Sequence, residues 1–119
     1  MRNSGITSEE RLEHIVKAIS DIETFIMGNT KDSYLGNDVL INATLFQFAI
    51  IGKAIMYVDN AILSKYNYPW HKVRGFKNFI VHEYHAIEFR IVWESIKNDL
   101  PELKKIIQTI LKKEFNNTK

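Results

Sequence analysis

The chain contains no cysteine, which removes two classes of structure at once. Without thiols there is neither a disulfide framework nor a thiolate metal site, and cysteine-based redox chemistry is excluded. Such a sequence suits a reducing compartment, so we expect a cytoplasmic protein. The first residues, MRNSGITSEERLEHIV, carry charges where a signal peptide would need an apolar run, and we therefore expect no export signal.

Proline and glycine are also scarce, with two and five residues among 119. No segment alternates apolar and polar residues for long enough to predict a strand. The sequence therefore predicts an all-α protein. Its length fits a single domain over residues 1–119 with a sizeable core.

Hydrophobic runs of membrane length are missing as well. The longest uncharged stretch, VLINATLFQFAIIG at residues 39–52, includes Asn42 and Gln47 and falls short of the roughly 20 apolar residues of a membrane span. We expect no membrane insertion. Because this stretch is apolar nearly all round, it predicts burial on several sides, at the centre of a bundle or beneath a second copy of the chain. The latter favours a homodimer.

Charge of one sign does not dominate. Sixteen Lys and Arg residues stand against fourteen Asp and Glu residues, for a formal charge of +2. This excess is too small to predict nucleic-acid binding from overall charge. Any such binding must come from a local site.

The first and last helices have the clearest sequence signals. The first is predicted to begin at Thr7 or Ser8, because Thr7 and Glu10 have capping-box spacing, and to end near Gly28. The last is predicted to have Pro101 near its start. The predicted core faces are Leu12, Ile15, Val16, Ile19, Ile22 and Ile26 in the first helix, and Leu103, Ile106, Ile107, Ile110, Leu111 and Phe115 in the last.

A second helix is predicted after the polar connector at residues 28–37. Asn37 or Asp38 can cap it, and its pattern runs from residue 39 to about residue 65. The segment KYNYPW then interrupts the pattern, because Pro69 disfavours helix at the residue before it and is tolerated in the first turn of a helix that follows.

The stretch VRGFKNFIVHEYHAIEFRIVW, residues 73–93, combines proton-transfer and phosphate-contact side chains with an apolar helical pattern. At 3.6 residues per turn it presents a polar ridge beside a buried ridge. The polar ridge is rich in groups that titrate near neutrality or hold anions, which indicates a site, although an amphipathic surface helix has the same pattern. The polar ridge consists of His71, Arg74, Asn78, His82 and His85, and the buried ridge of Val73, Phe76, Ile80 and Ile87.

The same stretch contains no complete metal or cofactor motif. The segment HEYH is one residue shorter than the His-Glu-x-x-His motif of zinc proteases. His82, His85 and Glu88 could still reach one ion, but no other ligand cluster accompanies them. Gly52 and Gly75 are isolated, so no phosphate-binding loop is predicted. We expect neither a metal nor a cofactor.

The segment PWHKVRGFKNFIVHEYHAIEFRIVWESIKNDLPELK, residues 69–104, resembles HepT-like proteins of the HEPN superfamily. In that family a Trp, a Gly, an Arg-Asn pair, a His-x-Tyr and a downstream VWE.IKNDLP recur in this order. The segment FQFAIIGKAIMYV, residues 46–58, is similar to the family's second-helix IGEA region. The resemblance covers most of the chain.

This resemblance implies a four- to five-helix up-and-down bundle that forms a homodimer. It implies a metal-independent endoribonuclease, the toxin of a toxin-antitoxin pair whose antitoxin is a nucleotidyltransferase. His82 matches the family's catalytic His, and Asn78 matches the Asn that follows the Arg. Tyr84 matches the tyrosine of His-x-Tyr, to which the nucleotidyltransferase can add AMP. The resemblance also implies a bend after Tyr84, where periodicity alone predicts a continuous helix.

The chain departs from the family pattern at Lys77, which stands in the position of the catalytic Arg. Cleavage of RNA without metal needs a base for the ribose 2'-OH proton, a donor for the leaving 5' oxygen and a cation for the charge on the phosphate oxygens. Lysine supplies a point charge, whereas arginine supplies a planar fork that grips two oxygens. Arg74 is the alternative clamp, although seven residues separate it from His82.

Three hypotheses follow for the function. The first is a ribonuclease toxin in which His82 is the acid-base residue, Lys77 or Arg74 stabilises the phosphate charge and Asn78 orients the phosphate or His82. A second is a catalytically weakened binding partner that presents Tyr84 or a nucleotide pocket to a nucleotidyltransferase. The last is a purely structural helical dimer.

Overall fold

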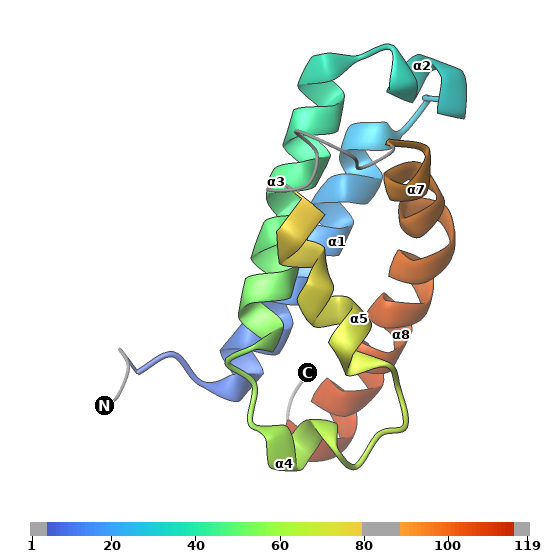
Figure 1. Cartoon of the computed structure of the whole chain (residues 1–119). Coiled ribbons are helices and arrows are strands. Elements are labelled where there is room, and N and C mark those ends of the chain that lie inside the picture. Colours follow the sequence, from blue (N-terminus) through green and yellow to red (C-terminus); the bar gives the residue numbers. More distant parts are fainter. Residues whose placement is uncertain (1–4, 80–88, 116–119) are drawn as a thin grey trace.

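The computed structural model describes residues 5–79 and 89–115 of the chain. All secondary structure in these residues is helical, which confirms the all-α prediction for them (Figure 1). The elements are α1 Ser8–Ile26, α2 Lys31–Leu35, α3 Asp38–Ile55, α4 Asn60–Leu63, α5 Trp70–Gly75, the 3-10 turn η1 Phe76–Asn78, α7 Phe89–Glu94, the π turn η2 Ser95–Asp99, α8 Leu100–Ile110 and the π turn η3 Leu111–Phe115.

Helix α1 begins as the sequence predicts. Thr7 caps it: the Glu10 N–H donates to Thr7 Oγ1 at 3.1 Å, and the Thr7 N–H donates to Glu10 Oε1 at 2.9 Å. After the helix ends, Gly28 has a φ of 81°, in the left-handed region that favours glycine. Of the predicted core face, Val16 is only partly buried; the buried residues are Leu12, Ile15, Ile19, Ile22 and Ile26.

The connector after α1 contains a helix that the sequence analysis did not predict. A reciprocal cap forms α2: the Ser33 N–H donates to Thr30 Oγ1 at 3.1 Å, and the Thr30 N–H donates to Ser33 Oγ at 2.9 Å. Tyr34 is fully buried there, and its hydroxyl shares a 2.7 Å hydrogen bond with Thr44 on α3. Burial raises the pKa of Tyr34 above its usual value of 10.0, and this short helix is therefore anchored to the core.

Helix α3 begins at its predicted cap but ends earlier than predicted. Asn37 Oδ1 accepts a 3.0 Å hydrogen bond from the Leu40 N–H. The prediction that the helix runs to about residue 65 is wrong, because it ends at Ile55 and a separate helix, α4, starts at Asn60. Asp59 makes this break: its side chain caps α4 at the Ala61 N–H at 2.9 Å, and its own N–H donates to Ser8 Oγ at 2.9 Å.

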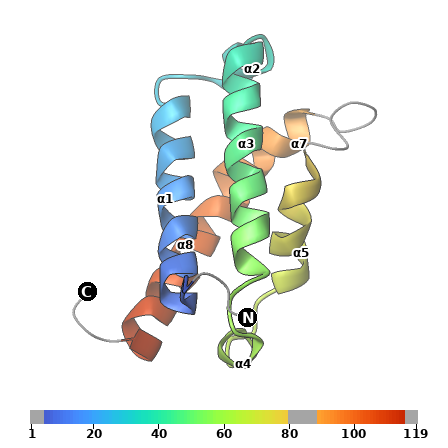
Figure 2. The ribbon, with the colours of Figure 1, turned by 90° about the vertical axis from the view of Figure 1, so that its left-hand side faces the viewer.

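Helix α3 is the central element of the core. Figure 2 shows it beside α1, with α5 on its other flank. Its apolar composition and 18-residue length would suffice for a membrane span, but half of its residues are directed inward against these neighbours. Phe48 is fully buried and contacts the rings of Phe76 and Phe79, each with a centroid distance of 5.0 Å. These rings join α3 to the segment that carries the polar ridge.

The carboxyl-terminal elements α7, η2, α8 and η3 follow one another in helical conformation. Pro101 lies in the first turn of α8, as predicted. The helical backbone is already present from Phe89, ahead of that proline. Of the predicted core face, Leu103, Ile107 and Ile110 are buried, while Ile106, Leu111 and Phe115 are partly buried.

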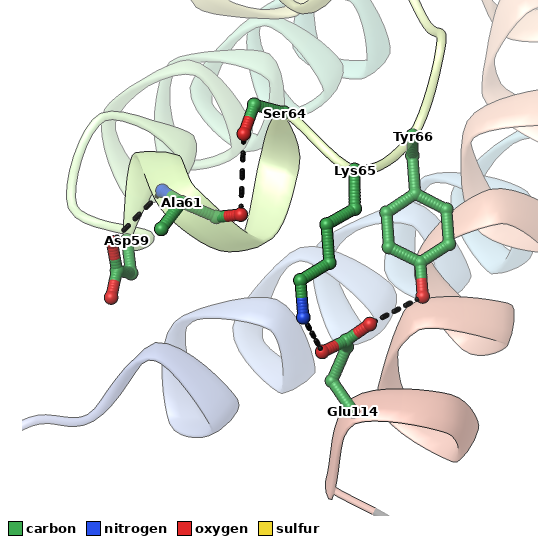
Figure 3. A network of polar contacts seen from close by, with 6 residues as sticks. All are labelled: Asp59, Ala61, Ser64, Lys65, Tyr66 and Glu114. Carbon is green, nitrogen blue, oxygen red and sulfur yellow. Dashed lines mark hydrogen bonds and ion pairs between the residues drawn. The ribbon is translucent and has the colours of Figure 1, made fainter.

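A polar network connects η3, at the end of the carboxyl-terminal elements, to the connector between α4 and α5 (Figure 3). Glu114 Oε1 accepts from Lys65 Nζ at 2.9 Å, and Glu114 Oε2 accepts from the Tyr66 hydroxyl at 2.8 Å. The hydrogen bonds from Lys65 and then Tyr66 lower the pKa of Glu114 below its usual 4.5, although burial works in the other direction. Nearby, Trp70 Nε1 donates to Leu63 O at 3.0 Å, so the start of α5 is also fixed.

Candidate functional site

Two of the predicted site residues, Lys77 and Asn78, lie side by side on the turn η1. Lys77 is exposed and Asn78 is partly buried. Lys77 Nζ lies 3.5 Å from Asn78 Oδ1, at the outer limit of a hydrogen bond. The turn therefore presents a cation and an amide together at the surface, the two kinds of group that hold a phosphate.

The backbone of Lys77 packs directly on α3 at Gly52. A Cβ atom at Gly52 would lie 2.4 Å from Lys77 N and 2.9 Å from Lys77 Cβ, too close for any residue other than glycine without movement of the turn. Gly52 thus allows η1 to approach α3 closely. From the sequence, Gly52 was interpreted only as an isolated glycine. The available signal was a glycine inside an otherwise apolar helix, which often marks a close backbone approach.

Aromatic packing fixes the same turn on either side of Lys77. Phe76 is buried against Phe48 in an edge-to-face contact, with an interplanar angle of 83°. Phe79 is partly buried and lies 5.6 Å from Phe76, centroid to centroid. Lys77 and Asn78 therefore sit on a backbone held by aromatic anchors, while their side chains extend outward.

The other polar-ridge residues in the described part of the chain lie on α5. His71 is exposed, and Arg74 is partly buried one turn before Asn78. Arg74 and Lys77 are both cations whose side chains only donate hydrogen bonds, so the α5–η1 segment carries two separate positive groups. Val73 and Phe76, from the predicted buried ridge, are both buried, which confirms the orientation of this part of the helix.

A second anchor connects α5 to η2. Asp99 Oδ1 accepts from Lys72 Nζ at 3.2 Å, and Asp99 Oδ2 accepts from Ser95 Oγ at 2.9 Å. Ser95 is buried and Asp99 partly so. The α5–η1 segment is therefore held between α3 and η2.

The remaining predicted site residues, His82 and Tyr84, lie outside the described residues. So do His85 and Glu88, the metal alternative, and the position of the implied bend. Among the residues that the structure does describe, no group of three or more His, Asp or Glu side chains is placed to hold a metal ion.

Comparisons with known proteins place the chain in a family. The family model described as "Ribonuclease HepT-like" matches residues 15–110. A protein of Caldanaerobacter subterraneus subsp. tengcongensis named "Putative RNase TTE0752" is 30% identical over 109 residues, which cover 91% of this chain and 97% of that protein. No solved structure matches the chain.

Two further relatives come from archaea. "Putative RNase MJ1380" of Methanocaldococcus jannaschii is 27% identical over 100 residues, 83% of this chain and 92% of the relative. "Probable ribonuclease HepT" of Thermococcus cleftensis is 27% identical over 97 residues, 81% of this chain and 88% of the relative. The matched regions include the turn with Lys77 and the glycine beneath it. The chain therefore belongs to the HepT-like ribonuclease family.

Proposed function

We propose that the chain is a metal-independent endoribonuclease, a single HepT-like domain over residues 1–119 that acts as the toxin of a toxin-antitoxin pair. Family membership supports ribonuclease activity. The observation that carries the proposal is the pairing of Lys77 with Asn78 on an exposed turn, directly before the segment that contains His82. A cation, an amide and an imidazole within six residues of sequence supply the groups for phosphodiester cleavage.

The proposed reaction is an internal transfer at phosphorus. His82 takes the proton from the ribose 2'-OH, whose oxygen attacks the phosphorus. The bond from phosphorus to the 5' oxygen breaks, and that oxygen leaves with a proton supplied by an acid, for which the His82 of a second copy is available in a dimer. The products are a 2',3'-cyclic phosphate and a free 5' hydroxyl. Neither a metal nor a cofactor takes part.

Lys77 stabilises the negative charge that grows on the phosphate oxygens, and Asn78 orients the phosphate or His82. Lysine does this as a point charge without the planar fork of arginine, so we expect slower cleavage than an arginine at this position would give. Arg74 remains the second candidate for the clamp, because it lies one turn away on the same helical segment.

A homodimer of four- to five-helix up-and-down bundles would bring two such turns to one cleft. The outward face of α3 supports the proposed dimer, because it exposes large apolar side chains that a partner copy would cover. We propose a cytoplasmic protein with single-stranded RNA as substrate, on which Tyr84 could stack. The exposed apolar residues of α3 and the turn after it are Val39, Phe46, Met56 and Tyr57.

Cleavage of RNA in the presence of a chelator tests this function. We expect wild-type protein to give fragments that end in cyclic phosphate, and His82→Ala to give none. His14→Ala is the matched control, because His14 is an exposed histidine on α1, far along the chain from η1. If wild type and His82→Ala leave RNA equally intact, the ribonuclease proposal is wrong.

The alternative function is a catalytically weakened partner of a nucleotidyltransferase antitoxin. Lys77 at the arginine position favours it, because a weaker clamp lowers catalysis without affecting partner binding. Co-expression with an adjacent nucleotidyltransferase is then expected to add the mass of AMP to the peptide that contains Tyr84, and Tyr84→Phe removes it. AMP found on any other peptide of the Tyr84→Phe protein measures nonspecific labelling. An unmodified Tyr84 and no complex would leave a structural helical dimer.

A further inference from the structure

A cavity of about 430 Å³ lies between the α5–η1 segment and the α7–η2 segment. Its size is within the range of small-molecule binding sites. Phe76 and Phe79, from η1 and the residue after it, form an apolar wall. The opposite wall, on α7 and η2, is polar at Glu94, Asn98 and Asp99 and also contains Ile91. An apolar wall that faces a few polar groups is the composition expected for a site that holds a flat, polar-edged molecule.

We infer that this cavity binds a nucleobase of the RNA strand, and that it prefers a base with an exocyclic amino group, namely adenine, cytosine or guanine. The inference deepens the proposed function and rests on it for the identity of the ligand. It assigns the residues that select the base, whereas Lys77 and Asn78 contact the phosphate.

Continuity with the phosphate site supports a nucleic-acid ligand. Phe76 and Phe79 line the cavity, and in the chain they flank Lys77 and Asn78 directly. A strand whose phosphate contacts η1 on its outer surface therefore has a neighbouring base within reach of the cavity. The cavities at Met27 and at Gln47, by contrast, have no residue of η1 in their lining.

The apolar wall suits the face of a base. It consists of the ring of Phe76 and the partly buried ring of Phe79, and Ile91, which is 55% exposed, adds apolar surface from α7. Bases stack on aromatic and aliphatic surfaces of this kind whatever their sequence, so this wall supplies affinity without selecting among bases. Selection must come from the polar wall.

The polar wall consists mainly of hydrogen-bond acceptors. The carboxylate of Asp99 is held in place by Ser95 at 2.9 Å and Lys72 at 3.2 Å, and each of its oxygens has a second lone pair. Glu94 Oε1 accepts from Asn98 Nδ2 at 3.3 Å and adds a second carboxylate to the lining. Each carboxylate is paired with a lysine, Asp99 with Lys72 at 3.2 Å and Glu94 with Lys31 at 3.6 Å. Their remaining lone pairs can accept hydrogen bonds from amino groups, as in the contact of Glu or Asp with cytosine N4. Uracil has no amino group.

Nucleotide titrations followed by NMR test the inference without requiring catalysis. Isotope-labelled protein is titrated separately with AMP, CMP, GMP and UMP, and the shifts of the Gly75 and Ser95 amides and of the Asn98 side-chain amide report on the cavity. We expect AMP, CMP and GMP to shift these signals saturably and to bind about tenfold more tightly than UMP, the effect of one or two hydrogen bonds to charged acceptors.

A double variant isolates the polar wall. Glu94→Ala with Asn98→Ala removes an exposed acid and an exposed amide one helical turn apart, and we expect it to abolish most of the preference over UMP. The matched control is Asp38→Ala with Asn42→Ala, which removes an exposed acid and an exposed amide with the same spacing from α3. That control keeps the wild-type preference.

Cleavage measured on the same samples separates this inference from the proposed function. Saturable shifts at the cavity that favour the amino-bearing nucleotides support the inference even if RNA stays intact. RNA cleavage without shifts at the cavity overturns the inference and leaves the ribonuclease proposal standing. Equal binding of all four nucleotides overturns the base preference. Cavity signals that change with protein concentration but not with nucleotide would show that a second copy fills the cavity, which also overturns the inference.

Discussion

The α1–α3 pair and the α5–η1–η2 region are built in different ways. The pair consists of two long regular helices with side-chain caps at Thr7 and Asn37 and a continuous apolar interface. The second region consists of a six-residue helix, a 3-10 turn and a π turn. It is held by the aromatic contacts of Phe48, by the close approach of Lys77 to Gly52 and by the hydrogen bonds of Asp99. Irregular helical turns often occur at functional sites. The candidate site thus lies where the chain departs from regular α-helix. Its position depends on contacts with residues that are distant in the sequence.

Phe48 joins the two regions, and its removal is expected to give the largest loss of stability. Phe48→Ala deletes a fully buried ring that contacts Phe76 and Phe79, so we expect the free energy of unfolding to fall by about 3–5 kcal/mol. Urea denaturation measures this loss. The matched control is Phe25→Ala on α1, where the side chain is 38% exposed and lies outside the proposed dimer face, so the expected change is about 1 kcal/mol or less. Equal losses of stability from the two variants would contradict the conclusion that Phe48 connects the two regions.

The contact between Gly52 and Lys77 is expected to give an intermediate effect. Gly52→Ala places a Cβ 2.4 Å from Lys77 N, so we expect a loss of about 1–3 kcal/mol despite the better helix propensity of alanine. Gly75→Ala is the control in the same region, because a Cβ there meets nothing within 4 Å. We expect that variant to gain about 0.5–1 kcal/mol.

The same two variants, Gly52→Ala and Gly75→Ala, also test whether RNA cleavage depends on the position of η1. Displacement of η1 by Gly52→Ala is expected to lower RNA cleavage, whereas Gly75→Ala leaves η1 in place. Thermal or urea denaturation and a cleavage assay are run on both proteins. A Gly52→Ala protein as stable and as active as wild type would show that η1 does not depend on the close approach.

The Glu114 network is expected to give the smallest effect, seen as a pH dependence of stability. The pKa of Glu114 is lowered in the folded state, first by its hydrogen bond from Lys65. Its contribution is therefore present above the unfolded-state pKa, near 4.5, and is lost as the pH falls through the lower folded-state value. Glu114→Gln is expected to flatten the free energy of unfolding in this acidic range.

Tyr66→Phe is an intermediate variant, because it removes one of the two hydrogen bonds to Glu114. It removes the 2.8 Å hydrogen bond to Glu114 but keeps the Lys65 contact, so we expect a pH dependence between those of wild type and Glu114→Gln. Urea denaturation at a series of acidic pH values gives the three slopes. A Glu114→Gln protein with the wild-type slope would assign the acid sensitivity to other carboxylates.

Local signals in the sequence predicted where the long helices begin. The Thr7–Glu10 cap, the Asn37 cap and Pro101 in the first turn of its helix are all confirmed, because each depends on residues a few positions apart. The break after Ile55 was missed. It depends on a contact between Asp59 and Ser8, which are 51 positions apart and share no local pattern.

The sequence named candidate site residues but not the contacts that hold them. Periodicity predicted Asn78, and the family resemblance implied both Asn78 and Lys77; the structure places the two side by side, and their roles stay predictions. Neither signal could show that Gly52 lies beneath Lys77, because a helix pattern specifies which face is apolar and not which backbone approaches it. The predicted roles of His82 and Tyr84 stay predictions, since both residues lie outside the described part of the chain.

The rate of metal-free RNA cleavage by a Lys77 series tests the central claim most directly. If η1 presents Lys77 to the phosphate, Lys77→Ala should lower the rate by about 100-fold, and Lys77→Arg should match or exceed wild type because its planar fork can hold two oxygens. Lys53→Ala, an exposed lysine on α3, is the control and should keep the wild-type rate. Cleavage by Lys77→Ala at the wild-type rate, with all four proteins equally folded, would contradict the claim.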